Sequence, residues 1–276
     1  MENHIPEGFR QELKRLNLCV VMPTYNNPTT VLQVLDRLRP YAADIIVVND
    51  GSTDDTPRLL SEYAQRVEDG DGLHVISYPQ NRGKGHALRC GFRKAIELGF
   101  DYAITIDSDG QHYPEDLPRL VDRLKTCLAQ GQERVLIVGN RKLQQENMPG
   151  GNTFANHFSN FWFALQTWQF LPDTQSGYRI YPLHHLHGLS LVTARYEAEL
   201  AILVLAAWHG VRLESAPIRV YYPPRDERVT HFRPFWDFVR ISVLNTVLCF
   251  LCFVYGWWAM LAIKLFGRRP QAAVSH

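Results

Sequence analysis

YAITIDSDGQH, residues 102–112, is the stretch of sequence that decides the fold. Residues 102–106 are apolar or β-branched at nearly every position, which is typical of a short strand buried on both faces. The run ends in two aspartates, Asp107 and Asp109, with Gln111 close behind. Strands of this kind belong to parallel sheets covered by helices, so the stretch favours an α/β fold with polar groups at the end of a buried strand.

The same pattern recurs along the first half of the chain. Further apolar runs lie at residues 18–22, 45–48, 74–77 and 135–138. Helical patterns separate the runs at residues 29–38, 56–66, 85–98 and 116–127. Alternating strands and helices predict a mainly parallel, Rossmann-like sheet flanked by helices. Later in the chain we expect a helix at 152–170, a loop at 173–181, a helix at 195–209, a strand at 211–221 and a last helix from about residue 235.

Composition limits the possible partners. The chain has 276 residues, 46% of them hydrophobic, and a formal net charge of +1. This length suits one α/β domain of about 200–250 residues with an appendage. A chain so close to neutral has no global field to attract nucleic acid, so a substrate phosphate must be met by local basic clusters. The five cysteines are scattered and odd in number, which argues against a disulfide framework.

Polar groups follow the predicted strands at the point where each strand ends. They lie in residues 23–27, 49–54, 107–112 and 139–141, and a further cluster, 81–85, opens a helix. Ligands of an open α/β sheet bind beyond the carboxyl ends of its strands. We therefore expect these segments to meet at one rim of the sheet.

The aspartates of the DSD motif have the chemistry of a cation site. Asp107 and Asp109 can share one hard cation, Mg²⁺ or Mn²⁺, with a diphosphate, and Gln111 can add an oxygen ligand. Such a cation neutralises charge on a departing nucleoside diphosphate. Taken alone, the same pair is also explained as turn or N-cap aspartates, and the other clusters decide between the two interpretations.

Asp50 and Lys84 carry two further hypotheses. Asp50 can accept hydrogen bonds from a base or ribose, although an Asx turn explains an isolated aspartate equally well. The glycines beside Lys84 let the backbone approach a phosphate, and the lysine supplies charge. A helix N-terminus also takes glycine for ordinary structural reasons.

The order of these clusters resembles the GT-A catalytic domain of family-2 glycosyltransferases. The subgroup it is most similar to contains the dolichol-phosphate mannosyltransferases and polyprenyl-phosphate glycosyltransferases. The resemblance covers roughly residues 18–222. It is carried by the motifs PTYNN, VVNDGSTDDT, NRGKGHALRCGF, DSDGQH, GNR, DTQSGYRIY and RYEAEL.

The resemblance implies roles for individual residues. Pro23, Tyr25 and Asp50 are expected to hold the nucleoside. Asp107 is expected to contact the donor, whose phosphates are assigned to Lys84 above on its charge, and Asp109 with Gln111 is expected to hold Mg²⁺ or Mn²⁺. For Arg141 and Arg179 the resemblance implies contacts with phosphate or the donor sugar.

One position departs from the pattern, and one role stays open. Asn27 stands where many relatives have Glu, so a carboxylate acceptor for the nucleoside is lost, which bears on base and ribose specificity more than on the reaction type. Glu197 and Glu199 open a helix, and either is a candidate general base for a hydroxyl acceptor. Because they are two residues apart they face different directions, and we expect Glu197 to be the catalytic one.

A basic loop precedes the last helix. Arg225, Arg228, His231 and Arg233 lie within nine residues and are candidates to bind an anionic lipid phosphate or the donor diphosphate. Basic residues beside a membrane also attract anionic lipid, and the two explanations are compatible. A lipid phosphate is already a nucleophile, so it requires no strong base.

The last helix has the composition of a membrane segment. Residues 241–263 carry no formal charge, and about 20 apolar residues suffice to cross a bilayer. A spanning helix, a helix in the plane of the membrane and a buried oligomer contact all remain open. The predicted organisation is an N-terminal extension at 1–17, a catalytic domain at 18–222, a basic loop and helix start at 223–240, the membrane helix at 241–263 and a basic tail at 264–276.

The sequence therefore predicts an inverting transferase that moves one sugar from a nucleotide-sugar to a polyprenyl phosphate or another lipid-linked acceptor. Nucleotide-sugars are cytosolic, so we expect a membrane-associated protein with a cytosolic catalytic domain. The single apolar segment and the lack of a QxxRW motif argue against a processive synthase. Two alternatives are a nucleotidyltransferase, which usually has a Gly-rich loop after the first strand, and a non-catalytic membrane scaffold. An oligomer is possible.

Overall fold

The computed structural model describes residues 8–67, 72–141, 150–186, 197–221 and 234–266, with backbone alone at 150–155, 157 and 234–238. The basic loop residues Arg225, Arg228, His231 and Arg233 lie outside the described residues.

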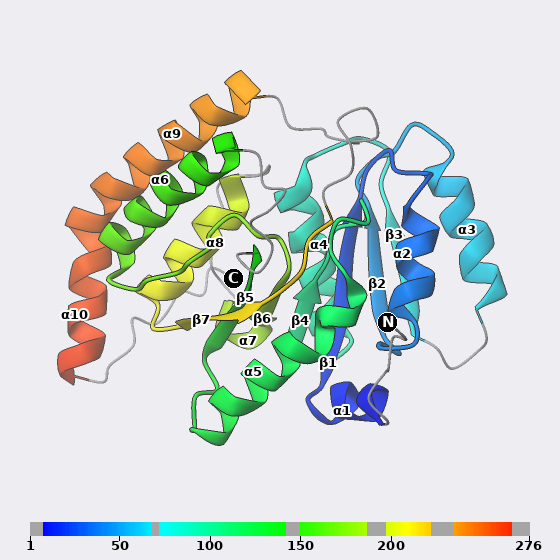
Figure 1. Ribbon diagram of the computed structural model, residues 1–276, viewed down its shortest axis with the longest axis horizontal. Helices are drawn as coiled ribbons and strands as arrows, with labels where there is room; N and C mark the ends of the chain where they lie inside the picture. The colour runs from blue at the N-terminus through cyan, green and yellow to red at the C-terminus, as the bar shows by residue number, and fades with distance from the viewer. Residues whose placement is uncertain (1–7, 68–71, 142–149, 187–196, 222–233, 267–276) are drawn as a thin grey trace.

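A seven-stranded sheet forms the centre of the molecule, in the order β3-β2-β1-β4-β6-β5-β7 (Figure 1). Its strands are β1 (Leu18–Thr24), β2 (Ile45–Asn49), β3 (Leu73–Ser77), β4 (Tyr102–Thr105), β5 (Val135–Asn140), β6 (Arg179–Pro182) and β7 (Arg212–Pro217). β1 to β4 pair in parallel, and so do β5 and β7, whereas β6 runs antiparallel to both of its neighbours. The predicted α/β fold with a mainly parallel sheet is confirmed.

Helices flank the sheet. They are α1 (Phe9–Arg15), α2 (Val31–Leu38), α3 (Thr56–Arg66), α4 (Lys84–Glu97), α5 (Leu117–Ala129), α6 (Gly150–Thr167), α7 (Leu183–Leu186) and α8 (Glu197–Trp208), with a short 3₁₀ turn η1 (Pro114–Asp116). The N-terminal extension predicted from the sequence includes α1, whose Phe9 and Leu13 belong to the main core.

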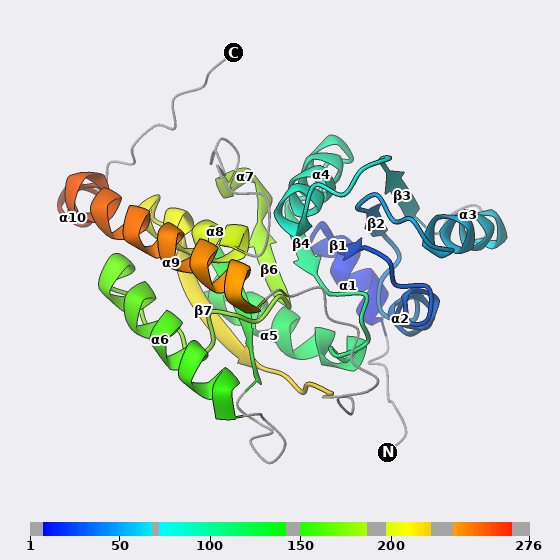
Figure 2. The same cartoon turned by 90° about the horizontal axis from the view of Figure 1, so that it is seen from above.

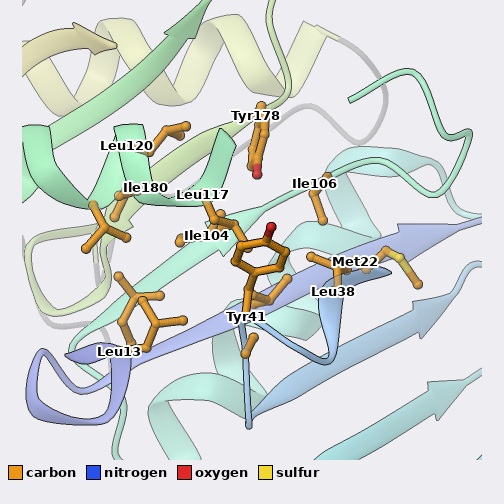
Figure 3. Packing of buried hydrophobic residues seen from close by; sticks show 14 of the residues in the cluster. Leu13, Met22, Leu38, Tyr41, Ile104, Ile106, Leu117, Leu120, Tyr178 and Ile180 are labelled. Carbon is orange, nitrogen blue, oxygen red and sulfur yellow. The ribbon is translucent and has the colours of Figure 1, made fainter. Parts of the chain in front are cut away.

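Alternation along the strands separates two cores. Leu18, Val20 and Met22 of β1 pack with α1, α2 and α5 on one face of the sheet, in the cluster drawn in Figure 3. Cys19 and Val21 pack with α4 on the other face. A strand buried on both faces needs an apolar residue at every position, which explains why the parallel strands read as continuous apolar runs.

The predicted loop at 173–181 is wrong at its end, because Arg179 starts β6. Arg179 pairs with Thr105 of β4 and Val138 of β5. β6 is four residues long, begins with a charged residue and ends with proline, so it lacks the apolar run that marks the other strands. Its antiparallel direction brings residues 173–178 to the rim where the parallel strands end.

The C-terminal helix runs along the outside of the molecule beside α6 and α8 (Figure 2). It comprises α9 (Pro234–Leu251), a π-helical turn η4 (Cys252–Gly256) and α10 (Trp257–Phe266). Its segment Val239–Phe266 has 28 residues, and an 18-residue window within it has a mean hydropathy of 2.0, so the segment is long and apolar enough to cross a membrane. The predicted apolar helix at the C-terminus is confirmed.

Candidate active site

The segments that the sequence predicts to share a rim do lie together. Asp50 at the end of β2 accepts hydrogen bonds from the backbone N–H groups of Arg82 and Gly83, each at 2.8 Å. The hydroxyl of Tyr78 donates to the same carboxylate at 2.7 Å. These bonds hold the turn before α4, where Gly83 has a φ of 92° that favours glycine. In this structure the Asp50 carboxylate therefore shapes the loop that places Lys84.

Lys84 lies between two carboxylates. Its Nζ is 2.7 Å from Oδ1 and 2.9 Å from Oδ2 of Asp107, and 3.1 Å from Oε2 of Glu199. Burial lowers the pKa of Lys84, but the charges of Asp107 and Glu199 outweigh burial and raise it. Burial raises the pKa of Asp107, and the Lys84 ammonium more than reverses this, so Asp107 is ionised. The three groups form one charge cluster, the Lys84 triad.

Gly177 makes room for the Lys84 triad. A Cβ on this residue would lie 2.8 Å from Lys84 Nζ, 2.9 Å from Asp107 Oδ2 and 3.1 Å from Glu199 Oε1. The Gly177 carbonyl accepts a bond of 2.7 Å from the hydroxyl of Thr105, which fixes the loop against β4. A side chain at this position would displace the charged groups of the triad, so glycine lets the three groups meet.

Of the two glutamates that open α8, it is Glu199 that joins the Lys84 triad. Glu199 is buried, and its Oε1 has no hydrogen-bond partner among the described residues. Glu197, which the sequence favours as the base, is the half-buried first residue of α8. The spacing of two residues correctly predicts that Glu197 and Glu199 point in different directions, but it does not predict which of them faces the sheet.

Asp109 is a third carboxylate beside the Lys84 triad. Burial and the nearby charge of Asp107 raise the pKa of Asp109 to about 6. Its Oδ1 accepts a bond of 3.0 Å from the backbone N–H of Gln111. Lys84 is shared between Asp107 and Glu199, and Asp109 adds a third carboxylate to the cluster.

This donor set fits a hard divalent cation. Asp107, Asp109 and the amide of Gln111 offer the oxygen ligands that Mg²⁺ and Mn²⁺ prefer. No group of three or more His, Cys, Asp or Glu residues is arranged to hold a metal within the described part of the chain. Ligands from the substrate would have to complete the coordination, which is usual for Mg²⁺ beside phosphates.

Asn27 holds the backbone of the DSD motif through buried hydrogen bonds. Its amide Nδ2 donates to the carbonyl of Ser108 at 2.7 Å, and its Oδ1 accepts from the hydroxyl of Thr30 at 2.7 Å. Asn27 is buried, with 4% of its surface exposed. An ionised carboxylate could not donate to the Ser108 carbonyl, so the amide at this position has a structural reason.

Arg141 and Arg179 sit differently from what the resemblance implies. Arg141 forms a two-bond ion pair with buried Asp173, at 2.6 and 2.9 Å. Arg179 is fully buried and donates to the carbonyls of Thr174, Ser176 and Glu199. Arg179 has no exposed surface and Arg141 is partly buried, and both hold the loop at 173–178.

The remaining predicted residues border the cluster. Pro23 lies near the end of β1, in register with Val48, and half-buried Tyr25 follows the strand. The chain after β7 passes the metal motif, because the N–H of Tyr221 donates to the Gln111 carbonyl at 2.8 Å and Val220 bridges to His112. The chain that leads into the basic loop therefore starts beside Gln111.

Sequence reasoning missed Gly177 and Tyr78. Gly177 stands in the quoted DTQSGYRIY motif, but the need for glycine appears only once β4 and α8 are in place. Tyr78 follows β3 directly, and its aromatic ring gave no hint of the bond to Asp50.

Known proteins share this architecture. The model of the family described as "Glycosyl transferase family 2" matches residues 19–185. A UDP-N-acetylglucosamine–dolichyl-phosphate N-acetylglucosaminyltransferase of Methanococcus voltae is 29% identical over 74% of this chain and 85% of its own length. An undecaprenyl-phosphate mannosyltransferase of Micrococcus luteus is 27% identical, over 74% of this chain and 83% of its own.

A solved structure matches the fold. Glucosyl-3-phosphoglycerate synthase from Mycobacterium tuberculosis, in complex with Mn²⁺, UDP and glucosyl-3-phosphoglycerate, covers 90% of this chain and 85% of its own, with a TM-score of 0.62 and 21% identity. At this identity the likeness establishes the fold alone. Because the family model covers more than half of the sequence, the chain belongs to glycosyl transferase family 2.

Proposed function

We propose that the protein transfers one sugar, with inversion, from a nucleotide-sugar to a polyprenyl phosphate. The observation that carries this proposal is the meeting of the Lys84 triad with Asp109 at the rim of the sheet. The cluster combines an ammonium for diphosphate oxygens with carboxylates for a cation. Membership of the family supports the reaction class, and it disfavours nucleotidyl transfer and a non-catalytic scaffold.

Asp107, Asp109 and Gln111 would hold Mg²⁺ or Mn²⁺. When bound, the cation would neutralise charge that develops on the departing nucleoside diphosphate. Lys84 would then contact the diphosphate, for which its ammonium is placed next to Asp107. The structural relatives with Mn²⁺ and UDP support a divalent ion of this kind.

Pro23, Tyr25 and Asp50 would line the nucleoside site. Pro23 lies near the end of β1, Tyr25 follows β1 and Asp50 follows β2. Arg141 and Arg179 would act by holding the loop at 173–178 in position, through Asp173 and backbone carbonyls. Direct contact of the buried Arg179 with the donor would require its present bonds to exchange.

The acceptor would be a lipid phosphate. Two relatives carry dolichyl-phosphate and undecaprenyl-phosphate in their names, which supports this class of acceptor. Arg225, Arg228, His231 and Arg233 would bind its phosphate, since the chain leading to them starts beside Gln111. A phosphate oxyanion attacks without a base, so Glu197 would be needed only for a hydroxyl acceptor.

The lipid acceptor implies that the protein works at a membrane. The apolar helix Val239–Phe266 supports membrane association. Since nucleotide-sugars are made in the cytosol, the catalytic domain would face the cytosol.

The experiment uses the purified full-length chain with vesicles that contain a polyprenyl phosphate. Nucleotide-sugars are supplied one at a time with Mn²⁺ or Mg²⁺. The proposal expects release of nucleoside diphosphate from one donor and transfer of labelled sugar to the organic phase. Asp109→Asn should reduce the rate by about a hundred-fold or more, because it removes charge at the reacting diphosphate. Asp122→Asn, on the exposed surface of α5, is the control and should keep full activity.

Other outcomes would overturn the proposal. Release of pyrophosphate from a nucleoside triphosphate would favour nucleotidyl transfer. No turnover with any donor would favour a scaffold. Transfer to a water-soluble phosphorylated acceptor, with none to lipid, would retain the glycosyltransferase and reject the polyprenyl phosphate.

A further inference from the structure

The helix α6 buries mostly polar side chains and exposes large apolar ones. Among its described side chains, the buried ones are mostly polar: Asn156, Ser159, Asn160, Gln166 and Thr167. Its exposed side chains are large and apolar, with Phe158 42%, Phe161 62% and Leu165 41% exposed. A water-exposed surface helix shows the opposite arrangement.

Hydrogen bonds fix α6 in this orientation. The Asn160 amide donates to the Pro172 carbonyl at 2.8 Å and accepts from the N–H of Thr174 at 3.1 Å. The hydroxyls of Ser159 and Thr174 are 2.7 Å apart. Rotating the helix to bury its aromatic side would break all of these bonds, so the apolar side faces outward.

A second apolar surface lies alongside. The helix α9–η4–α10 presents Phe250, Phe253, Trp258 and Leu265 to the outside, each at least 59% exposed. Trp168, just after α6, stacks on Trp257 of α10 with ring centroids 6.0 Å apart. Figures 1 and 2 show α6 and α9 side by side along the same flank. Together the exposed side chains of α6, α9, η4 and α10 form one surface, the α6–α10 face.

The chemistry of the α6–α10 face matches a lipid bilayer. There is no Lys, Arg, Asp or Glu between Glu146 and Asp173, and none from residue 241 to residue 263. Soluble monomers rarely expose an apolar patch of several hundred Å². Tryptophan is enriched where protein meets the headgroup layer, and this surface carries Trp168 and Trp258.

Basic residues bracket the apolar stretch of this helix. Arg240 precedes it and Lys264 ends it, with Arg268 and Arg269 next in the sequence. Such positions suit the negative charge of anionic headgroups. A second protein copy would need no such flanking charge, so we assign the surface to a membrane.

The helix is attached to the catalytic domain along its length. Leu244, Leu248 and Cys252 are buried, and Cys252 Sγ donates to the Gln166 carbonyl. Gly256 packs so closely on Trp208 that a Cβ would lie 2.4 Å from the ring. A helix that crossed the bilayer would leave these contacts or pull α8, which carries Glu199, into the membrane.

We propose that the α6–α10 face lies in the plane of the membrane surface, with α6 and α9–α10 both inserted on their outer sides. A helix in this position buries its apolar side at the boundary of headgroups and acyl chains. The inference deepens the proposed function and rests on it for the reason why a membrane is needed. It is tested by binding, without turnover, so its failure is distinct from failure of the proposed catalysis.

The test is flotation of the full-length protein with sealed vesicles of phosphatidylcholine and phosphatidylglycerol. Phe161→Ser with Phe170→Ser changes only exposed side chains, 62% and 72% exposed, on the α6 side. Phe250→Ser changes the α9 side. Each variant is expected to bind vesicles about ten-fold more weakly or worse, a loss of about 1.4 kcal/mol or more, because at least one phenyl ring no longer enters the membrane. Leu98→Ser, 38% exposed at the end of α4, is the matched control and should bind like the original chain.

Topology is measured on the same vesicles. A tag after residue 276 should be removed by protease added outside, because an in-plane helix leaves the C-terminus on the side of the catalytic domain. Protection of the tag, or full binding by the Phe161→Ser/Phe170→Ser variant, would overturn the inference. So would conversion of a dimer to a monomer by that variant with unchanged vesicle binding, which would assign the face to a second copy. Circular dichroism and Tm of each variant establish that it is folded.

Discussion

Lys84 Nζ contacts both oxygens of the Asp107 carboxylate, at 2.7 and 2.9 Å, while Glu199 Oε2 lies 3.1 Å away on its other side. One ammonium thus serves two carboxylates in a largely buried site. In the proposed function Lys84 also stands where the diphosphate would arrive, next to Asp107. Substitution of Lys84 should therefore change two quantities that can be measured separately, the stability of the fold and the affinity for nucleoside diphosphate.

Lys84→Met should lower both stability and affinity for nucleoside diphosphate. Removal of one partner from a buried ion pair costs about 3 kcal/mol, because the remaining charges are left uncompensated. Loss of a phosphate contact should weaken nucleoside diphosphate binding by about ten-fold or more. Denaturant unfolding and nucleotide titration measure the two effects.

Lys94→Met on the same helix, which breaks only the exposed pair with Glu97, should change neither the stability nor the nucleotide affinity by more than a few tenths of a kcal/mol. Unchanged nucleotide affinity in a folded Lys84→Met protein would remove Lys84 from the donor site.

Gly177→Ala should impair catalysis more than folding. The added Cβ would lie within 3.1 Å of all three groups of the Lys84 triad. Lys84 has a flexible side chain and can move, so the protein should still fold with the triad displaced. We expect a fall in kcat of about ten-fold or more and a small change in Tm. Gln175→Ala, on the exposed part of the same loop, is the control. Equal activity of the two variants would show that the triad tolerates displacement.

The sequence predicts the parallel part of the fold well, because strands such as β1 and β2 are buried on both faces and must be apolar throughout. β6 could not be predicted in this way. Its residues Arg179 and Pro182 break the apolar run, and its place between β4 and β5 follows from long-range pairing.

The rim could be predicted because its polar segments follow the ends of the strands. The hydrogen-bond and ion-pair partners of each side chain could not be predicted. Nothing local distinguishes Glu199 from Glu197, since the choice depends on how α8 meets the sheet. The burial of Arg179 is hidden for the same reason: its acceptors are carbonyls of Thr174, Ser176 and Glu199, which only the fold brings together.

The Arg141–Asp173 pair predicts a dependence of stability on pH. Burial raises the pKa of Asp173, but the hydrogen bonds and charge of Arg141 lower it by more, so the net shift is downward. A depressed pKa contributes stability that is present above the unfolded value, about 3.9, and is lost as pH falls through the folded value. Asp173→Asn should therefore cost about 3 kcal/mol at pH 7, and the difference from the original chain should shrink below about pH 4.

Denaturant unfolding at a series of pH values from 7 to 3 measures this difference. Asp122→Asn, which alters only an exposed residue, should show almost no difference at any pH. A constant gap between the original chain and Asp173→Asn across the series would mean that the charge of Asp173 is not what stabilises the loop at 173–178.

Asn27→Asp tests why this chain has an amide beneath the DSD motif. The change replaces the donor that bonds the Ser108 carbonyl at 2.7 Å with an acceptor, so two oxygen atoms would face each other in a buried site. We expect a loss of about 2 kcal/mol in the free energy of unfolding and weaker nucleotide binding, because the DSD backbone would shift. Asn26→Asp is the matched control, since Asn26 uses mainly its Oδ1, which accepts from Thr53 N–H at 2.8 Å and which aspartate retains. If the two variants are equally stable, the amide of Asn27 does not hold the motif.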